Sequence, residues 1–298
     1  MPRQVSTRNS SSSRDSVRAD LQRLDDLHFD PDAQVDLALQ FVERSSNLDV
    51  LRRALSIVQA AGDSAARPIL HRAYERSDAK SDSGGFIRAL IVRALRPIAH
   101  PDDQPILERA LLTYQMVGMY DTAGELRSAA LVALNDINPD LAALHAARFL
   151  IDPRNGNSGE PALSAIRVLA AQQNLPPVFA FAAWCQGTSD LNGEALRSLG
   201  ELPESLVWLL VGVYREREDE QELLGLFDLL LAHPARPRFR SEIEHFLRTT
   251  GLIDLYGLVA MQVVVTRDPD LIHLLRELAK TEADALRRSL LEQALIHA

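Results

Sequence analysis

The amino-acid sequence predicts an all-α fold of the α-solenoid type, in which antiparallel helix pairs stack one after another. First, the phrase Pro-Ile-Leu-x-Arg-Ala occurs at 68–73 and again 37 residues later at 105–110. Second, each copy follows an amphipathic stretch that also recurs, beginning at Leu51 and Ile87. Third, strong helix formers dominate, with only 14 glycines and an aromatic share of 5%. A period of this length with two helical segments is typical of stacked helix-pair arrays.

The first half of the chain shows helical patterns separated by short gaps and no convincing period-2 strand. Pro directly after Asp, Asn or Glu indicates a helix start, because the first helical N–H has no partner and the preceding side chain can cap the next ones. Such dipeptides occur at 30–31, 138–139, 160–161 and 268–269. In order, we expect helices at 15–28, 31–44, 47–61, 64–77, 85–98, 102–115, 121–135 and 138–150.

The second half continues the helical pattern, although its repeat register weakens after residue 215. We expect helices at 160–171, 176–186, 192–200, 203–215, 219–232, 239–249, 253–265, 269–279 and 282–296. Segments 78–85 and 152–159 are rich in Gly, Ser, Asp and Asn, which predicts turns between stacked units rather than domain linkers. The prediction is therefore one solenoid domain over 15–298, with the repeat register clear over 47–150.

Composition disfavours several classes of partner. The net charge is −9 and only two of the basic residues are Lys, whereas nucleic-acid binders usually carry a basic surface, so nucleic acid is not the expected partner. No apolar run approaches the roughly 20 residues that a membrane helix needs. The single Cys185 excludes an intramolecular disulfide. Residues 1–14 are rich in Ser and Arg without the apolar centre of a secretory signal, which predicts a disordered tail, with a transit peptide as the alternative. We expect a cytoplasmic protein.

The segment 126–134, Leu-Arg-Ser-Ala-Ala-Leu-Val-Ala-Leu, resembles the second helix of a HEAT repeat, and 87–95 follows the same register. Residues 51–58 do so more loosely. The resemblance implies a HEAT-like superhelix whose second helices line a concave face, with the Arg of each motif bonded to an acidic residue of a neighbouring repeat. By this resemblance Arg52, Arg88 and Arg127 form a ladder on the inner side. The ladder either fixes the stacking of repeats or offers a stripe that binds a partner.

Residues with catalytic potential are sparse and scattered. Glu242 and His245 have the Glu-x-x-His spacing of di-iron bundles, but such sites need two of these motifs and the sequence contains one. Zinc-binding and phosphate-binding motifs are missing. Cys185 is expected to be a buried, inert thiol rather than a nucleophile, and Trp184 and Trp208 are expected to pack in the core. We therefore predict no catalytic residue, no cofactor and no metal.

The favoured function is a non-catalytic scaffold or adaptor that binds another protein or peptide on an acidic, curved helical surface. Acidity favours a partner with a basic segment. The alternative is a HEAT-like enzyme acting in the concave face, similar to the alkyl-purine DNA glycosylases or the bilin lyases. The chain departs from the glycosylase pattern through its acidity and scarcity of Lys, so no catalytic residue is carried over. Whether the chain is an enzyme is left open, with the non-catalytic interpretation favoured.

Overall fold

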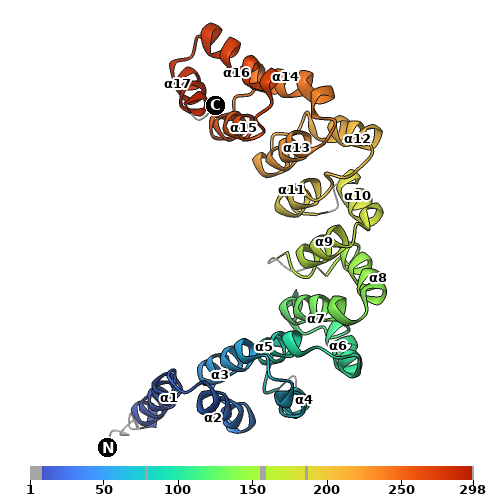
Figure 1. The fold of residues 1–298 in the computed structure, drawn as a ribbon. Helices are drawn as coiled ribbons and strands as arrows, with labels where there is room; N and C mark the ends of the chain where they lie inside the picture. Colours follow the sequence, from blue (N-terminus) through green and yellow to red (C-terminus); the bar gives the residue numbers. More distant parts are fainter. Residues whose placement is uncertain (1–8, 78–79, 155–158, 185–186, 297–298) are drawn as a thin grey trace, which may run out of the picture. The chain divides into compact units, whose positions relative to one another are not determined.

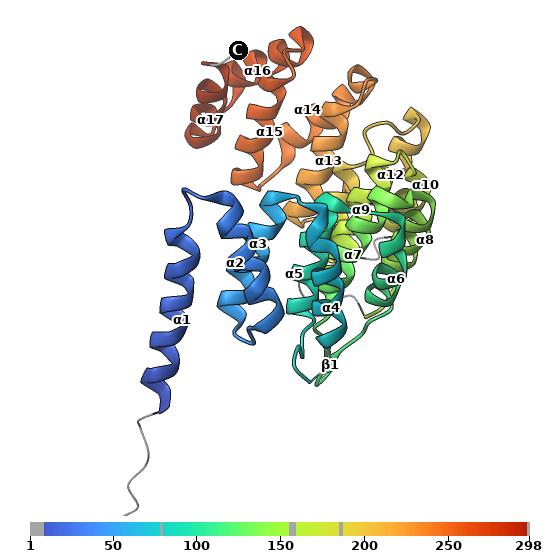
Figure 2. The same cartoon turned by 60° about the horizontal axis from the view of Figure 1, so that its bottom comes forward.

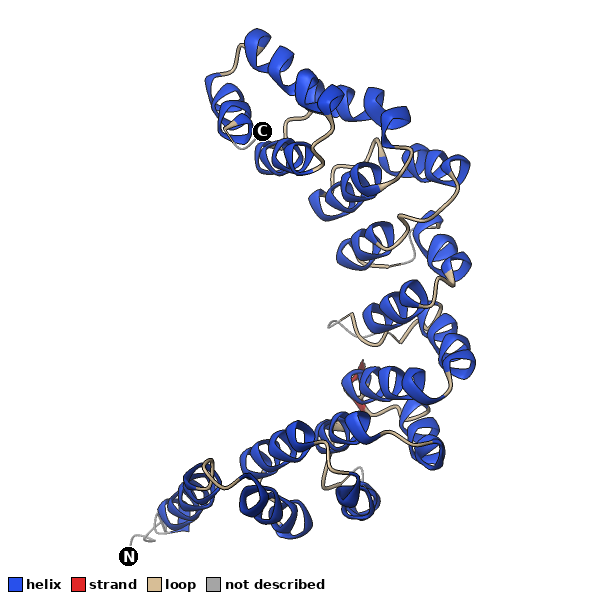
Figure 3. Ribbon diagram, viewed as in Figure 1, coloured by secondary structure: helices blue, strands red, loops and turns tan. Residues whose placement is uncertain are grey.

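The computed structural model describes residues 9–77, 80–154, 159–184 and 187–296, and over these residues it confirms the all-α prediction. The described chain forms seventeen α-helices, four short 3-10 helices and one small β-hairpin (Figure 3). No described helix combines the length and the apolar character that crossing a membrane requires. The α-helices are α1 (Asn9–Asp26), α2 (Pro31–Arg44), α3 (Leu48–Ala61), α4 (Arg67–Arg76), α5 (Phe86–Leu95), α6 (Gln104–Leu111), α7 (Gly124–Ile137), α8 (Pro139–Leu150), α9 (Ala162–Ala171), α10 (Leu175–Ala183), α11 (Ser189–Arg197), α12 (Glu204–Tyr214), α13 (Glu220–Ala232), α14 (Arg240–Thr249), α15 (Ile253–Val265), α16 (Pro269–Thr281) and α17 (Ala285–Leu295).

The remaining elements are short. The 3-10 helices are η1 (Ser64–Ala66), η2 (Arg96–Ile98), η3 (Pro101–Asp103) and η4 (Arg236–Phe239). The strands β1 (Met116–Val117) and β2 (Tyr120–Asp121) pair antiparallel, and they correct the expectation that the chain contains no strand. Gly118 has a φ of 64° in the two-residue connection between them. Glycine at such a position allows a tight hairpin to form in a stretch with no alternating pattern.

The chain divides into two compact units, Met1–Ala165 and Ile166–Ala298. In the first unit each helix packs on its neighbour in the chain, α2 on α3, α4 on α5 and α6 on α7. The second helices of these pairs also pack on one another, α3 on α5 and α5 on α7, while α2 packs on α4 (Figures 1 and 2). Two layers of helices result, with the apolar residues buried between them.

The second unit repeats these relations. Helix α10 packs on α11, α12 on α13, and α16 on α17. One layer consists of α11, α13, α15 and α17, each in contact with the next, and α10 with α12 and α14 with α16 form contacts in the other layer (Figure 1). The buried side chains are mostly Leu, Ala and Val, as the low aromatic share predicted.

Helix starts follow the expected capping chemistry. Pro31, Pro139 and Pro269 each occupy the first turn of a helix, and the preceding residue accepts a hydrogen bond from a free backbone N–H. At the fourth dipeptide, Glu160–Pro161, α9 begins one residue after the Pro, and the Glu160 carboxylate accepts a hydrogen bond from the backbone N–H of Ser164 at 3.1 Å. Helix α1 begins at Asn9, inside the segment 1–14 that we expected to be disordered, since an established helix extends cooperatively. Residues 1–8 of that segment lie outside the described part.

Ion pairs connect each helix pair to the next, but through Arg residues other than the predicted ones. The Arg of the duplicated phrase is used twice in the same way: Arg72 lies 2.5 Å from Glu43, and Arg109 pairs with Glu75. These contacts join α4 to α2 and α6 to α4. Arg93 on α5 pairs with Glu125 on α7 at 2.5 Å. Each exposed ion pair of this kind stabilises a fold by at most about 1 kcal/mol. Such pairs therefore favour one register of helix packing but contribute little to its stability.

Candidate functional site

The structure places the three predicted Arg residues in three different environments. Arg52 is exposed on α3, Arg88 is 8% exposed at the start of α5, and Arg127 is fully buried in α7. Each of the two buried residues pairs with an Asp six residues earlier, in the loop that leads into its own helix. The predicted bond to a neighbouring repeat is therefore wrong for both. Ser46 stands six residues before Arg52, which has no such partner and extends into solvent.

Asp82 holds the first turn of α5. Its carboxylate accepts hydrogen bonds from the backbone N–H of Ile87 at 3.0 Å and of Arg88 at 3.1 Å. The Arg88 guanidinium then donates to the same carboxylate at 3.0 Å. An acidic group at a helix N-terminus interacts favourably with the helix dipole. The pair therefore fixes the loop onto the helix, and it presents little surface to a partner.

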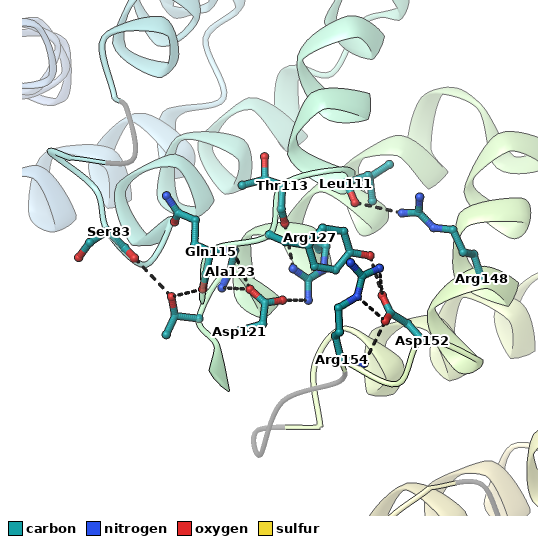
Figure 4. A network of polar contacts seen from close by, with 12 residues as sticks. Ser83, Leu111, Thr113, Gln115, Asp121, Ala123, Arg127, Arg148, Asp152 and Arg154 are labelled. Atoms are coloured by element: carbon teal, nitrogen blue, oxygen red, sulfur yellow. Dashed lines mark hydrogen bonds and ion pairs between the residues drawn. The ribbon is translucent and has the colours of Figure 1, made fainter. Parts of the chain in front are cut away.

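Arg127 makes the corresponding contact one helix pair later (Figure 4), and it is more deeply buried than Arg88. Its guanidinium lies 2.5 Å from the Asp121 carboxylate at the end of β2 and donates to the carbonyl of Thr113 at 2.9 Å. Asp121 also accepts the backbone N–H groups of Gln115 at 2.9 Å and Ala123 at 3.1 Å. The buried pair thus ties both ends of the hairpin to α7. A fully buried guanidinium cannot contact a partner, so Arg127 anchors the hairpin instead.

The ring of Tyr114 packs against the guanidinium group of this ion pair. Its ring centroid lies 4.2 Å from the guanidinium carbon of Arg127 and 3.8 Å from that of Arg154. Cations over an aromatic face are attracted by its quadrupole. The Tyr114 hydroxyl donates to Asp152 at 2.6 Å, and Arg154 donates to the same carboxylate at 3.0 Å, so the segment after α8 is held against the base of the hairpin (Figure 4).

Asp152 is charged in this environment. Burial raises the pKa of its carboxyl group, but the hydrogen bonds from Arg154 and Tyr114 outweigh burial and hold the pKa below its usual value. Burial, together with the hydrogen bond to Asp152, raises the pKa of the Tyr114 hydroxyl. A carboxylate with a lowered pKa stabilises the folded state above its unfolded pKa of about 3.9, and that contribution is lost as the pH falls below this value.

We therefore expect Asp152→Asn to lower the free energy of unfolding by about 2 kcal/mol at neutral pH, the range for a charge-assisted hydrogen-bond network. Below about pH 4 the difference in unfolding free energy between the variant and the wild type should shrink, because the Asp152 carboxyl group then takes up a proton when the wild type unfolds. Urea unfolding from pH 3 to pH 7 measures both values. Asp140→Asn, at an exposed position, is the control. A constant difference across this pH range would contradict the assignment.

The hairpin that this cluster anchors carries apolar side chains into solvent. Met116 is 54% exposed, Val117 57%, Met119 86% and Tyr120 57%. Its base is held on a second side, since the Thr122 hydroxyl contacts the carbonyls of Ser83 and Gln115 at 3.3 and 3.0 Å. We call residues 116–120 the apolar hairpin. Sequence reasoning placed this segment in a gap between helices; the signal it missed was the Asp six residues before Arg88 and before Arg127.

The other candidates show little that is reactive. Glu242 and His245 line a cavity of about 520 Å³ among α12, α13 and α14, where Glu242 lies 4.0 Å from Arg215. Within the residues that the structure describes, no three His, Cys, Asp or Glu side chains gather as metal ligands. Trp208 is half-buried against Phe239, whereas Trp184 is 71% exposed and corrects the expected core position, because it lies at the C-terminal end of α10 beyond the packed face. Cys185 lies outside the described residues.

Comparison with known proteins adds no relative: no protein-family model matches the chain, and no curated protein sequence matches it.

Proposed function

We propose that the chain is a HEAT-like α-solenoid. Three observations support this architecture. Within each unit the second helices pack on one another in succession, as stacked pairs require. Ion pairs recur between helices one pair apart, with Arg72 and Arg109 at equivalent positions. The Asp82–Arg88 and Asp121–Arg127 pairs have the same internal spacing and lie 39 residues apart.

We further propose that this solenoid is a non-catalytic adaptor that binds another protein, and the apolar hairpin carries this proposal. Met and Tyr are enriched where protein interfaces are most buried, and a contiguous set of exposed apolar side chains marks such a surface. The hairpin is anchored at its base by the buried Arg127–Asp121 pair, so little conformational entropy is lost when its tip is covered.

Charge indicates the kind of partner. The chain has a net charge of −9, which steers basic segments toward it and disfavours acidic ones. The apolar hairpin itself carries no charged side chain, so it supplies contact area while the net negative charge of the chain favours the approach of a basic segment. We propose a protein partner with an apolar patch next to a basic segment.

The test is affinity capture from the native host with quantitative mass spectrometry. The variant Met119→Ser/Tyr120→Ser removes the two outermost apolar groups without touching the buried cluster. We expect this variant to capture at least about tenfold less of each partner than the wild type does, which is the effect of losing central interface side chains. Phe29→Ser/Leu144→Ser removes equally exposed apolar groups elsewhere, at 87% and 67% exposure, and should retain the partners.

Equal capture by the hairpin variant and the wild type would overturn the proposal. Retention on DNA that weakens with rising salt would favour the enzymatic alternative, since phosphate contacts release counterions. Both variants change exposed residues, so their unfolding midpoints should match that of the wild type.

A further inference from the structure

We propose that a groove between α15 and α17 binds an amphipathic helix of a partner protein, with a Lys or Arg of that helix next to Asp254. This inference rests on the proposed protein-binding function and names the kind of segment that a second surface takes. The groove has a volume of about 500 Å³. Its walls are Gly257, Leu258 and Met261 from α15 and Leu286 and Leu290 from α17, with Asp254 at the rim. We call these residues the C-terminal groove.

The outer face of α15 carries exposed apolar side chains next to the Asp254 carboxylate. Tyr256, Val259 and Val263 are buried against the rest of the unit. On the opposite side Leu258 is 51% exposed and Met261 41% exposed. Exposed apolar side chains that adjoin one another on a helix surface indicate a surface that another molecule covers. Leu286 on α17, at 56% exposure, extends the same patch across to the neighbouring helix.

The shape of the groove favours a helix as the occupant. Two packed helices present parallel ridges with a channel between them, into which the side chains of a third helix can insert. The lining runs from Ile253 to Met261, which is about 12 Å at the helical rise per residue, or two turns. An amphipathic helix offers anchors at i, i+3 or i+4 and i+7 over this length. Met261 adds an unbranched side chain that adapts to different anchors.

Asp254 gives the groove its charge preference. It is exposed at the start of α15, and among the described residues none forms a hydrogen bond or ion pair with its side chain. Among the side chains that line the groove, all of them in the described part, none is basic. Residues 166–298 contain 13 Arg and Lys against 19 Asp and Glu. A two-fold dimer through this groove would bring the Asp254 carboxylates of both copies to one interface, so a basic helix is favoured over a second copy.

Gly257 keeps the floor of the groove open. It lies inside α15, where Ala is the better helix former. A Cβ atom there would meet only the Leu290 side chain, at 3.4 Å, which is near ordinary contact. Packing within the chain therefore does not require Gly at this position, and Gly leaves more room between α15 and α17 than a larger residue would.

The test is fluorescence anisotropy of the full chain with a designed, fluorescein-labelled helix of about 18 residues, long enough to become helical on binding. The probe carries Leu at i, i+3, i+4 and i+7 and Lys elsewhere. A second probe has the same composition in scrambled order, and a third has Glu in place of Lys. We expect the first probe to bind at least about tenfold more tightly than the other two. Equal binding of the scrambled probe would overturn the proposal.

Variants locate the binding on the chain. Leu258→Lys should weaken the first probe at least about tenfold, and Asp254→Asn should weaken it several-fold and reduce its salt dependence. Leu144→Lys changes a residue on α8 whose exposure is similar to that of Leu258, and this variant should bind the first probe as the wild type does. Gly257→Ala should raise the thermal midpoint and yet weaken the probe. Unchanged probe binding in Leu258→Lys would contradict the site; circular dichroism confirms that each variant is folded.

Two further measurements separate this inference from the proposed function. The hairpin variant Met119→Ser/Tyr120→Ser should bind the probe as the wild type does. Partner capture at the apolar hairpin can therefore fail while the groove still binds the probe. Probe binding at the groove can likewise fail while the hairpin still captures its partners. Sedimentation velocity of the wild type and Leu258→Lys tests a second copy as the occupant. A dimer that dissociates on this substitution would assign the groove to self-association and overturn the proposal.

Discussion

Arg127→Ala is expected to lower the free energy of unfolding by about 3–5 kcal/mol, the cost of removing one partner of a buried ion pair. The Asp121 carboxylate, whose side chain is 1% exposed, would remain buried without its counterion. Because Asp121 also bonds the backbone at both ends of the hairpin, its relocation toward water would release the hairpin. Chemical denaturation measures the loss, and amide hydrogen exchange at 115–123 should rise with it.

The chain supplies matched controls. Arg52→Ala removes the same side chain from the equivalent position of an earlier helix, where it is exposed, and should change stability by no more than about 0.5 kcal/mol. Arg127→Met combined with Asp121→Asn removes both charges and should recover much of the loss, because neither charge is then left alone. Equal stability of Arg127→Ala and Arg52→Ala would contradict the structural role of Arg127.

Gly225→Ala is expected to cost about 3 kcal/mol, because the added methyl group would meet backbone rather than side chain. A Cβ atom at Gly225 would lie 2.5 Å from the carbonyl oxygen of Gly193 and 2.6 Å from its Cα atom. Helix α13 would have to move away from α11, which also strains the buried bond of 2.8 Å between Asn192 and Glu222. When no side chain can move to relieve overpacking, the destabilisation lies at the upper end of the range that overpacking usually causes.

Gly212→Ala, in the neighbouring helix α12, is the control with the opposite sign. A Cβ atom there has nothing within 4 Å, so the substitution should stabilise the protein by roughly 0.5–1 kcal/mol through helix propensity alone. Thermal and urea unfolding of both variants give the comparison. A small effect of Gly225→Ala, similar in size to that of Gly212→Ala, would show that α11 and α13 are not in backbone contact.

Local chemistry made most of the fold predictable. Asp30-Pro31, Asn138-Pro139 and Asp268-Pro269 determine helix starts within a few residues, since the cap and the Pro act on adjacent N–H groups. The 3.6-residue spacing of Leu and Ala determines the helices themselves. The HEAT resemblance singled out Arg52, Arg88 and Arg127 and implied partners in neighbouring repeats. The partners of Arg88 and Arg127 are instead Asp82 and Asp121, in segments whose conformation helical periodicity does not describe.

The candidate site was harder to predict for a specific reason. Asp82 and Asp121 stand six residues before their Arg partners, and Ser46 stands at that position before Arg52. The difference is visible in the sequence, but its meaning depends on whether the loop folds back onto its helix. Glycine shows the same limit: Gly193, Gly212 and Gly225 look alike in the sequence, and only the distance to the neighbouring backbone distinguishes them.

The sequence by itself determined that this protein is helical, where its helices begin, and that two Arg-containing helices are related. Those properties arise from contacts a few residues apart along the chain. The tertiary structure alone decided that Arg127 is buried while Arg52 is exposed, that residues 116–120 form an apolar hairpin, and that α15 and α17 leave a groove between them. These properties depend on which surfaces remain uncovered after helices distant in sequence have packed, and burial of that kind is set by the whole arrangement of a unit.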